Sequence, residues 1–409
     1  MQKNKAFPFI KTILSLRMFV ALAMGFSCGL PLLLTIGLLQ AWMKESGADL
    51  TAIGLIALVG LPYTLKFLWA PIFDFYSLPF LGRRRGWLLV IQLTLVLAII
   101  SMGLADPVKT PVLLVISAIA VTFFSASQDV IIDAYRREDL SDKELGLGSA
   151  FYINGYRLGM LLASGGGMIM ADHMSFNTVY LIMAACMIPG IITTIMCKEP
   201  YTVYGKSTNF YNAVVDPLKD YFTRKGAIHI ILFILLYKVG DTMASFMTTP
   251  FYLDIGFTKT EIGAVVKLFG LWAIVAGTIV GGTLMLRIGI IKALFIFGFL
   301  QAASTACFAA LSFTGPSLWV LACVIAFENF SGGMGTSAYT AYMASITNKR
   351  FTATQYALLS GLMGIPRVIT SAPTGFMVEI TGWPTFFLLC SVIAIPGIIL
   401  IKYIEGFQN

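Results

Sequence analysis

Asp129 and Asp133 stand four residues apart in the apolar stretch SASQDVIIDAYR, residues 125–136. On a helix this spacing places both carboxyl groups on one face. A second pair, Lys238 and Asp241, is three residues apart, and Glu328 lies in a third apolar stretch. A buried carboxyl beside a movable cation can switch between proton-bound and proton-free states. The pattern therefore predicts proton transfer on Asp129, or on Asp241 coupled to Lys238.

These charges lie in a chain that the composition places in a membrane. The 409 residues are 58% hydrophobic and only 12% charged, with a mean hydropathy of +0.85. A soluble protein carries about 25% charged residues. A helix that crosses a bilayer needs about 20 mostly apolar residues, and the chain contains twelve such segments: 17–42, 52–76, 86–105, 111–136, 145–171, 177–197, 226–253, 260–286, 290–313, 317–346, 352–379 and 384–404.

The basic residues predict the orientation of the chain. If both termini are cytoplasmic, most of the 28 Lys and Arg residues fall on the cytoplasmic side, and only Lys44, Lys109 and Lys259 fall on the other. This asymmetry is typical of membrane proteins. The net charge of +8 is then explained by anionic lipid, so no nucleic-acid partner is expected.

The longest polar interval, 198–225, divides six predicted spans from six and gives three regions: 1–197, 198–225 and 226–409. Within the interval, Phe210, Val214, Leu218 and Phe222 recur every four residues. This stripe favours an amphipathic helix on the membrane surface, and a solvated linker is the alternative.

An internal repeat relates the two halves. TAIG at 51–54 returns as TEIG at 260–263, and Arg157 and Arg367 occupy equivalent places. Six spans per half give both halves the same direction. The predicted fold is therefore an all-α polytopic membrane protein of the major facilitator type, with twelve transmembrane helices in two parallel six-helix repeats and a site between them.

A candidate gate lies in the loop after the second predicted span. Asp74 is followed by the run Gly82-Arg83-Arg84-Arg85-Gly86, which is similar to the major facilitator loop motif, in which an acid and an arginine pair. Simple positive anchors are the alternative for the arginines. Asp74, Arg84, Asp133 and Arg136 are the predicted gate residues, with Arg136, Arg137 or Arg157 as the partner of Asp133.

Charged residues at membrane depth are costly and tend to face a wet interior. The predicted site for substrate and proton comprises such charges with nearby amides and tyrosines: Asp129, Lys238, Asp241, Glu328, Gln128, Asn329, Arg157, Arg367, Lys66, Lys267, Tyr63 and Tyr156. The alternatives are structural ion pairs for the acids, an architectural role for the two arginines, snorkelling for the lysines, and core packing for the tyrosines. The small-residue run 331–335 is expected to serve close helix packing.

Several stretches together resemble the anhydromuropeptide permeases, a branch of the major facilitator superfamily. They include LQAWM at 39–43, FLWAPIFD at 67–74, GRRRGWLL at 82–89 and SASQDVIIDAYR at 125–136. GYRLGML at 155–161, YKVGD at 237–241, FENFSGGMGTSAY at 327–339 and ATQYALLS at 353–360 extend the resemblance through both halves. The resemblance implies proton-coupled import of N-acetylglucosaminyl-1,6-anhydro-N-acetylmuramyl peptides across a bacterial inner membrane. It also implies roles in peptidoglycan recycling and β-lactamase induction.

Other functions receive little support from the sequence. His173 and His229 have no partner pattern for catalysis, and the six cysteines show no metal-ligand spacing, so neither an enzyme nor a cofactor is expected beyond the proton gradient. The expected partners are the cargo, protons and the lipid bilayer, and the chain is expected to act as a monomer. A carrier for another anionic or sugar-like solute, including an acetyl-CoA-type transporter, is the alternative.

Overall fold

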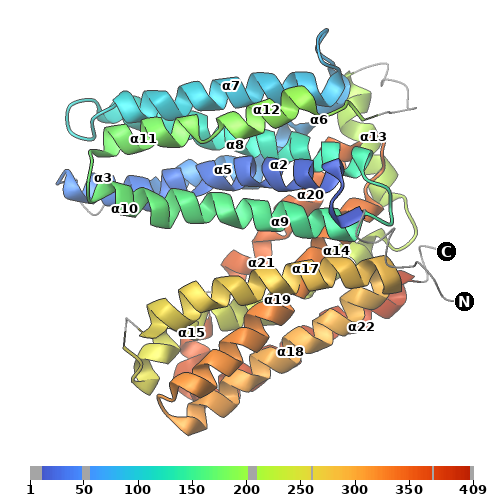
Figure 1. Cartoon of the computed structure of the whole chain (residues 1–409). Helices are drawn as coiled ribbons and strands as arrows, with labels where there is room; N and C mark the ends of the chain where they lie inside the picture. Colours follow the sequence, from blue (N-terminus) through green and yellow to red (C-terminus); the bar gives the residue numbers. More distant parts are fainter. Residues whose placement is uncertain (1–11, 48–55, 201–209, 259–260, 371–372, 406–409) are drawn as a thin grey trace, which may run out of the picture. The chain divides into compact units, whose positions relative to one another are not determined.

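The computed structural model describes residues 12–47, 56–200, 210–258, 261–370 and 373–405. Within these ranges every regular element is a helix (Figure 1). The chain forms two compact units: unit 1 contains Met1–Pro217 and Thr347–Gly361, and unit 2 contains Leu218–Ile346 and Leu362–Asn409. In the described part of the chain, nine helices are long and apolar enough to cross a membrane. The all-helical prediction is confirmed.

Unit 1 contains long helices joined by short polar turns (Figure 1). Pro111 begins α8 and Ser175 caps the start of the α11 helix by accepting from the Thr178 amide, as expected for residues suited to helix starts. The helices of unit 1 before its central interval are α2 (Leu16–Leu33), α3 (Leu39–Glu45), α5 (Leu61–Leu65), α6 (Ala70–Phe75), α7 (Arg83–Leu104), α8 (Pro111–Asp139), α9 (Leu145–Leu161), α10 (Gly167–Ala171), α11 (Phe176–Ala185) and α12 (Ile188–Met196).

Several of the predicted spans are interrupted, among them the second, fifth and eleventh. The second contains short pieces of 3-10 and α-helix between Ile56 and Phe75. The fifth passes through a π-helical turn at Leu162–Gly166, and the eleventh separates into α20 (Thr352–Leu362) and α21 (Gly364–Ile369) before the last long helix. Among the described residues, the nine helices long and apolar enough to cross a membrane lie in the other nine predicted spans.

Helices α2 and α9 approach each other through glycines. A Cβ on Gly25 would lie 2.1 Å from the carbonyl oxygen of Tyr152, and one on Gly155 would lie 1.9 Å from that of Leu22. Only a residue without a side chain fits such a contact, which is the small-residue packing expected of membrane helices. This close packing fixes the position of α9 beside α2.

Unit 2 uses the same kind of contact between a different pair of helices. A Cβ on Gly277 of α17 would lie 2.0 Å from the carbonyl oxygen of Phe330, and one on Gly333 of α19 would lie 2.5 Å from that of Ile274. The packing role expected for the run 331–335 is confirmed at Gly333. The helices of unit 2 are α14 (Ala227–Leu236), α15 (Val239–Ile255), α17 (Gly270–Ile288), α18 (Ile290–Thr314), α19 (Leu318–Ile346), α21 and α22 (Thr374–Glu405).

The segment Thr347–Gly361 belongs to unit 1, although its neighbours in sequence on both sides belong to unit 2. Ala353 and Ala357 of α20 are buried in an apolar core with Val130 and Ile131 of α8. This segment therefore reaches the polar ends of α6, α7 and α8. The domain boundaries 1–197, 198–225 and 226–409 stay a prediction.

The predicted amphipathic helix is present as α13 (Phe210–Phe222). Tyr211 and Phe222 are exposed, and Tyr221 is buried. The expected place of this helix on the membrane surface stays a prediction.

Candidate functional site

Arg84, in the first turn of α7, is the most deeply buried cation among the described residues, with an exposed fraction of 0%. Its guanidinium donates to Asp74 Oδ1 at 2.7 Å and to the carbonyl oxygen of Phe73 at 2.9 Å. A guanidinium offers five donors in a fixed plane, which suits several acceptors around one centre. The contact between the predicted gate residues Asp74 and Arg84 is present, and their role as a gate stays a prediction.

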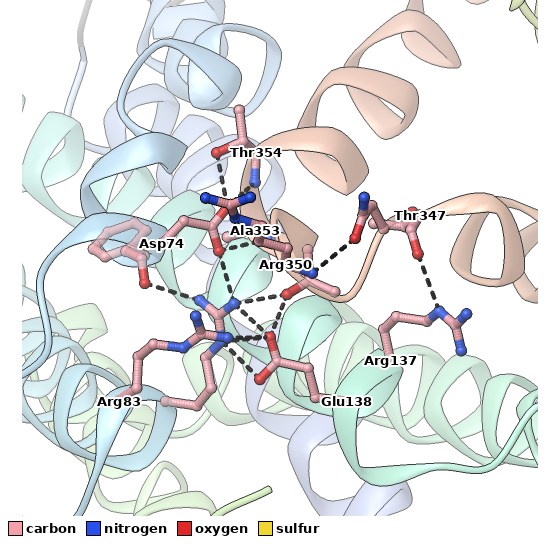
Figure 2. A network of polar contacts seen from close by, with 12 residues as sticks. Asp74, Arg83, Arg137, Glu138, Thr347, Arg350, Ala353 and Thr354 are labelled. Carbon is pink, nitrogen blue, oxygen red and sulfur yellow. Dashed lines mark hydrogen bonds and ion pairs between the residues drawn. The ribbon is translucent and has the colours of Figure 1, made fainter. Parts of the chain in front are cut away.

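Glu138, near the end of α8, is the second acid at this centre. Arg84 Nη2 donates to Glu138 Oε1 at 2.6 Å, and Arg83 Nη2 donates to the same oxygen at 2.7 Å. Thr352, at the start of α20, donates its hydroxyl to Glu138. Figure 2 shows Arg83 and the Glu138 carboxyl turned toward each other. We call Asp74, Arg83, Arg84, Glu138, Thr352 and Thr354 the arginine network.

Asp74 holds the start of α20 in place. Its carboxylate accepts from the backbone amides of Ala353 at 3.2 Å and Thr354 at 2.9 Å, and from the Thr354 hydroxyl at 2.8 Å (Figure 2). The first amides of a helix have no partner within the helix and attract negative charge. Asp74 therefore joins the end of α6 to the first turn of α20.

A further acid, Glu199, binds the backbone at the start of α7, where the arginines of the network lie. Glu199 accepts from the backbone amides of Arg84 at 2.8 Å and Arg85 at 3.0 Å, which caps α7. Gly82 precedes these residues with a φ of 91°, and a Cβ there would lie 2.6 Å from Glu199 Cδ. Glycine is required at this position for both the backbone angle and the space.

Asp133 and Arg136 form a separate pair in unit 1. Arg136 Nη2 lies 3.1 Å from Asp133 Oδ1 and donates to the Tyr356 hydroxyl at 2.9 Å. Arg136 also donates to Ser149 Oγ at 2.5 Å. Of the three partners proposed for Asp133, the structure selects Arg136.

Asp129 lies deeper in α8, among polar side chains of several helices. Lys66 is buried and interacts electrostatically with Asp129 and with Asp133. Gln128 donates through Nε2 to the carbonyl oxygen of Ser27 at 2.8 Å. Tyr63 and Tyr156 interact electrostatically with Asp129. We call Tyr63, Lys66, Ser125, Gln128, Asp129 and Tyr156 the Asp129 cluster.

Several buried atoms of this cluster have no hydrogen-bond partner in the described structure. They are Tyr63 Oη, Ser125 Oγ, Gln128 Oε1 and Asp129 Oδ1. Buried polar atoms are nearly always hydrogen-bonded in folded proteins, so a group of unpartnered ones marks a place for water or a polar ligand. The Asp129 cluster is therefore the candidate binding region of unit 1.

Three further cations were predicted at the site: Arg157, Lys267 and Arg367. Arg157 is half-buried, and its Nη1 has no hydrogen-bond partner among the described residues. A guanidinium in this condition suits a carboxylate ligand. The side chains of Lys267 and Arg367 lie outside the described residues.

Unit 2 brings its three predicted charges together. Helix α14 ends at Leu236, and α15 begins at Val239, so Lys238 lies at a break in the predicted seventh span. Its Nζ donates to Asp241 Oδ2 at 3.1 Å and to Gln301 Oε1 of α18 at 3.2 Å. Glu328 of α19 interacts with both Asp241 and Lys238.

Two serines complete this group. Ser304 Oγ lies 2.6 Å from Glu328 Oε2 and 2.7 Å from Ser331 Oγ. We call Lys238, Asp241, Gln301, Ser304, Glu328 and Ser331 the carboxyl cluster. Asn329, also predicted, instead donates to the carbonyl oxygen of Ile325 within its own helix at 3.0 Å.

The sequence interpretation missed several of the residues that build these sites, including Glu138, Glu199, Gln301 and Ser304. Glu138 directly follows Arg136 and Arg137, and this stretch was interpreted from its two arginines alone. Glu199 lies outside the predicted spans. Gln301 and Ser304 are polar residues in the predicted ninth span, which was not expected to line the site. Their polarity within an apolar segment was the available signal.

Comparisons with known proteins agree with the helical architecture. A family model described as Major Facilitator Superfamily matches residues 18–371. The fucose:proton symporter FucP of Escherichia coli superposes with a TM-score of 0.73 at 14% identity, covering 97% of this chain and 98% of that chain. The proton:xylose symporter XylE superposes with a TM-score of 0.70 at 11% identity, covering 97% and 96%. The chain is a multi-pass membrane protein and belongs to the major facilitator superfamily.

Relatives in sequence identify the family within this superfamily. The chain is 44% identical over 387 residues to the anhydromuropeptide permease of Escherichia coli strain K12, covering 94% of this chain and 79% of that protein. It is 32% identical over 403 residues to the putative transporter AmpG 4 of Rickettsia conorii, covering 96% and 97%. The chain therefore belongs to the family of the anhydromuropeptide permease, as the resemblance predicted.

Proposed function

We propose that this protein imports anhydromuropeptides across the bacterial inner membrane together with protons, for reuse of cell-wall material. The observation that carries the proposal is the 44% identity to an anhydromuropeptide permease over 94% of the chain. The protein acts as a monomer with both termini in the cytoplasm. The cargo's role in β-lactamase induction follows from the same resemblance.

The Asp129 cluster suits the sugar part of such a cargo. Tyr63 Oη and Gln128 Oε1 have no hydrogen-bond partner in the described structure, and sugar hydroxyl and acetamido groups offer both donors and acceptors. Arg157 Nη1 is also unpartnered and matches a carboxylate of the stem peptide. A site with few, well-placed polar groups in an apolar wall is typical of small-molecule recognition.

The arginine network supplies a contact that transport must break and remake. Asp74 binds the first turn of α20, and the rest of the chain on both sides of Thr347–Gly361 belongs to unit 2. In alternating access, the two repeats move relative to each other. We propose that release of α20 from Asp74 accompanies this movement, and that protons on Asp129, or on Asp241 beside Lys238, drive it.

Cargo identity is tested with right-side-out membrane vesicles that contain the protein and an inwardly directed proton gradient. Labelled N-acetylglucosaminyl-1,6-anhydro-N-acetylmuramyl peptide is expected to accumulate above its external concentration, and a protonophore is expected to abolish the accumulation. Labelled acetyl-CoA and a simple sugar serve as the competing cargoes. Accumulation of one of these in place of the muropeptide would support the alternative carrier.

Asp129→Asn is the first variant to compare in this assay. The substitution removes the charge that Lys66 faces while keeping the size of the side chain, so proton-driven accumulation is expected to be lost. Membrane insertion, measured by the amount of protein in the vesicles, is expected to be unchanged. Glu379→Gln removes an exposed acid of α22 and serves as the control. Accumulation against a gradient by Asp129→Asn would contradict the role assigned to Asp129.

A further inference from the structure

We propose that a groove between the start of α18 and the end of α22 binds an anionic phospholipid. The phosphate lies between Lys292 and Lys402, and an acyl chain lies along the apolar walls. The groove belongs wholly to unit 2 and shares no residue with the carboxyl cluster. The inference concerns the membrane around the protein, so it does not depend on the identity of the cargo.

The groove lies where two neighbouring membrane-spanning helices reach the same edge of the membrane. Helices α18 and α22 lie side by side within unit 2 (Figure 1). The apolar segment of the first begins at Ile290, and that of the second ends at Ile404. Lys292 therefore stands near the start of one span, and Lys402 stands near the end of the other. Phospholipid headgroups occupy this boundary between hydrocarbon and water.

The groove has the size and the lining of a small ligand site. Its volume is about 300 Å³, and protein ligand pockets range from about 300 to 1,000 Å³. Two cations and four apolar side chains form the described lining, which contains no acid: Ile291, Lys292, Phe295, Ile296, Ile401 and Lys402. Lys292, Ile296 and Lys402 are exposed. A ligand can therefore enter the groove from the surrounding membrane.

The two lysines are available to bind an anion. Neither has a salt-bridge partner in the part of the chain that the structure describes. Lys402 Nζ instead lies 5.8 Å from the centre of the Phe295 ring, a contact typical of a cation over an aromatic face. A phosphate between the lysines would relieve the repulsion of two like charges and accept charge-assisted hydrogen bonds from both. Basic pockets between membrane helices are known to bind lipid headgroups in this way.

An exposed apolar strip continues from the groove along both helices. Ile296 and Phe299 of α18 are exposed, as are Ile395 and Ile399 of α22. Positions three or four apart lie on one face of a helix. The strip runs from the lysines toward the middle of the two spans. The surface is therefore charged at one end and apolar along the rest, which matches a phospholipid better than a small hydrophilic anion.

A close contact between α18 and α22 sets the position of the groove. A Cβ on Gly298 would lie 3.0 Å from Ile398 Cγ1, so the two helices approach each other closely at this glycine. Nearer the polar ends, the exposed ring of Tyr403 stacks on the exposed ring of His229 in α14, with centroids 6.4 Å apart. Tyrosine at the end of a span is typical of the headgroup level. The groove therefore lies at the depth of lipid phosphates.

The experiment is native mass spectrometry of the whole chain in detergent, titrated with dioleoyl phosphatidylglycerol. Dioleoyl phosphatidylcholine has the same acyl chains and no net charge, so it is the reference lipid. The wild-type protein is expected to bind the anionic lipid about tenfold more tightly than the reference, because each lysine near the headgroup adds attraction for negative charge. Equal binding of the two lipids would overturn the inference.

The lysines are tested with the double variant Lys292→Gln/Lys402→Gln. It is expected to bind phosphatidylglycerol about tenfold more weakly than the wild-type protein and to lose the preference for that lipid. Lys109→Gln/Lys143→Gln removes the same charge from two exposed lysines of unit 1 and is expected to bind like the wild-type protein. Thermal unfolding without added lipid checks that both double variants are folded. A retained preference in the first variant, or an equal loss in the second, would overturn the inference.

The apolar wall is tested with Ile296→Asn. This side chain is 47% exposed, so its replacement weakens the acyl-chain contact without opening the core, and binding of phosphatidylglycerol is expected to weaken severalfold. Ile119→Asn, at a side chain of α8 that is 46% exposed, is the matched control.

Inorganic phosphate at the same concentration as the lipid is expected to leave the bound lipid in place. Displacement of the lipid by inorganic phosphate, or unweakened lipid binding in Ile296→Asn, would show that the groove recognises charge alone. Either result would overturn the assignment of a phospholipid.

Discussion

The arginine network of unit 1 contains two buried acids, and the carboxyl cluster of unit 2 contains two half-buried acids. The two regions also differ in the number of cations that face those acids. Arg83 and Arg84 face Asp74 and Glu138, and the hydroxyl of Thr352 adds a donor. Lys238 alone faces Asp241 and Glu328 among the described side chains. Among the described side chains, two cations balance two acids in the first region, and one cation faces two acids in the second. The two regions therefore differ in charge balance as far as the structure describes them.

The type of cation reinforces this difference. Arg84 donates to four different groups in a fixed plane, and a guanidinium stays charged under all ordinary conditions. Lys238 has a flexible stem and holds one acid and one amide. The planar guanidinium of Arg84 therefore fixes several acceptors at once, whereas Lys238 fixes fewer.

The largest effect is expected from removing the central cation of the network. Arg84→Ala leaves Asp74 and Glu138 buried without their main partner, which typically costs about 3–5 kcal/mol. Lys238→Met removes the cation of the carboxyl cluster, where the acids can take up a proton instead. The loss of folding stability in Lys238→Met is therefore expected to be clearly smaller than that in Arg84→Ala. Thermal unfolding in detergent measures both, with the exposed Glu379→Gln as control. An equal loss of folding stability in the two variants would contradict the difference proposed between the two regions.

A moderate effect is expected when the hydrogen bonds between Asp74 and the first turn of α20 are removed. Asp74→Ala removes the acceptor of the Ala353 and Thr354 amides, a change comparable to loss of a helix cap at about 1–2 kcal/mol. Hydrogen exchange at these amides is then expected to accelerate by about tenfold or more. Amides of α18, in unit 2, provide the internal reference. Unchanged exchange at Ala353 and Thr354 would show that α20 is held by its apolar contacts alone.

The smallest effect is expected at Glu144, an acid outside the network and the predicted spans. Burial raises the pKa of Glu144, but the hydroxyl and amide of Ser141 and the nearby Arg17 outweigh it and hold that pKa below its usual value. A lowered pKa stabilises the folded state above the unfolded value of about 4.3, and the contribution disappears as the pH falls through the lowered value.

The corresponding measurement compares the unfolding temperature of Glu144→Gln with that of the wild-type protein. A small difference is expected at pH 7, and it is expected to shrink as the pH falls below the unfolded value of about 4.3. Glu379→Gln, again the exposed control, is expected to match the wild-type protein throughout this range. A difference for Glu144→Gln that grows toward acid would contradict the sign of the pKa shift.

The sequence predicted the membrane class and most span positions well because apolar length is a local property. Helix α8 (Pro111–Asp139) and helix α19 (Leu318–Ile346) contain the predicted fourth and tenth spans. The second, fifth and eleventh spans were predicted as continuous, and the structure breaks them. Hydropathy does not distinguish a continuous helix from one interrupted by π-helical or 3-10 turns, because both bury the same side chains.

The candidate site was predictable to the extent that it depends on neighbours along one helix. The pairs Lys238 with Asp241 and Asp133 with Arg136 follow from a spacing of three residues, which a helix places side by side. The roles of these residues, and the expected convergence of the Asp129 cluster and the carboxyl cluster on one chamber, stay predictions.

By itself, the sequence determined that this protein lies in a membrane and which of its residues are too polar to face lipid, since the cost of burying each group is set by its own chemistry. Only the tertiary structure decided which charges meet. Glu138 finds Arg84 across 54 positions, and Asp74 finds Thr354 across 280. Hydrogen bonds act over about 3 Å, so such pairings exist only once helix packing has brought distant segments together.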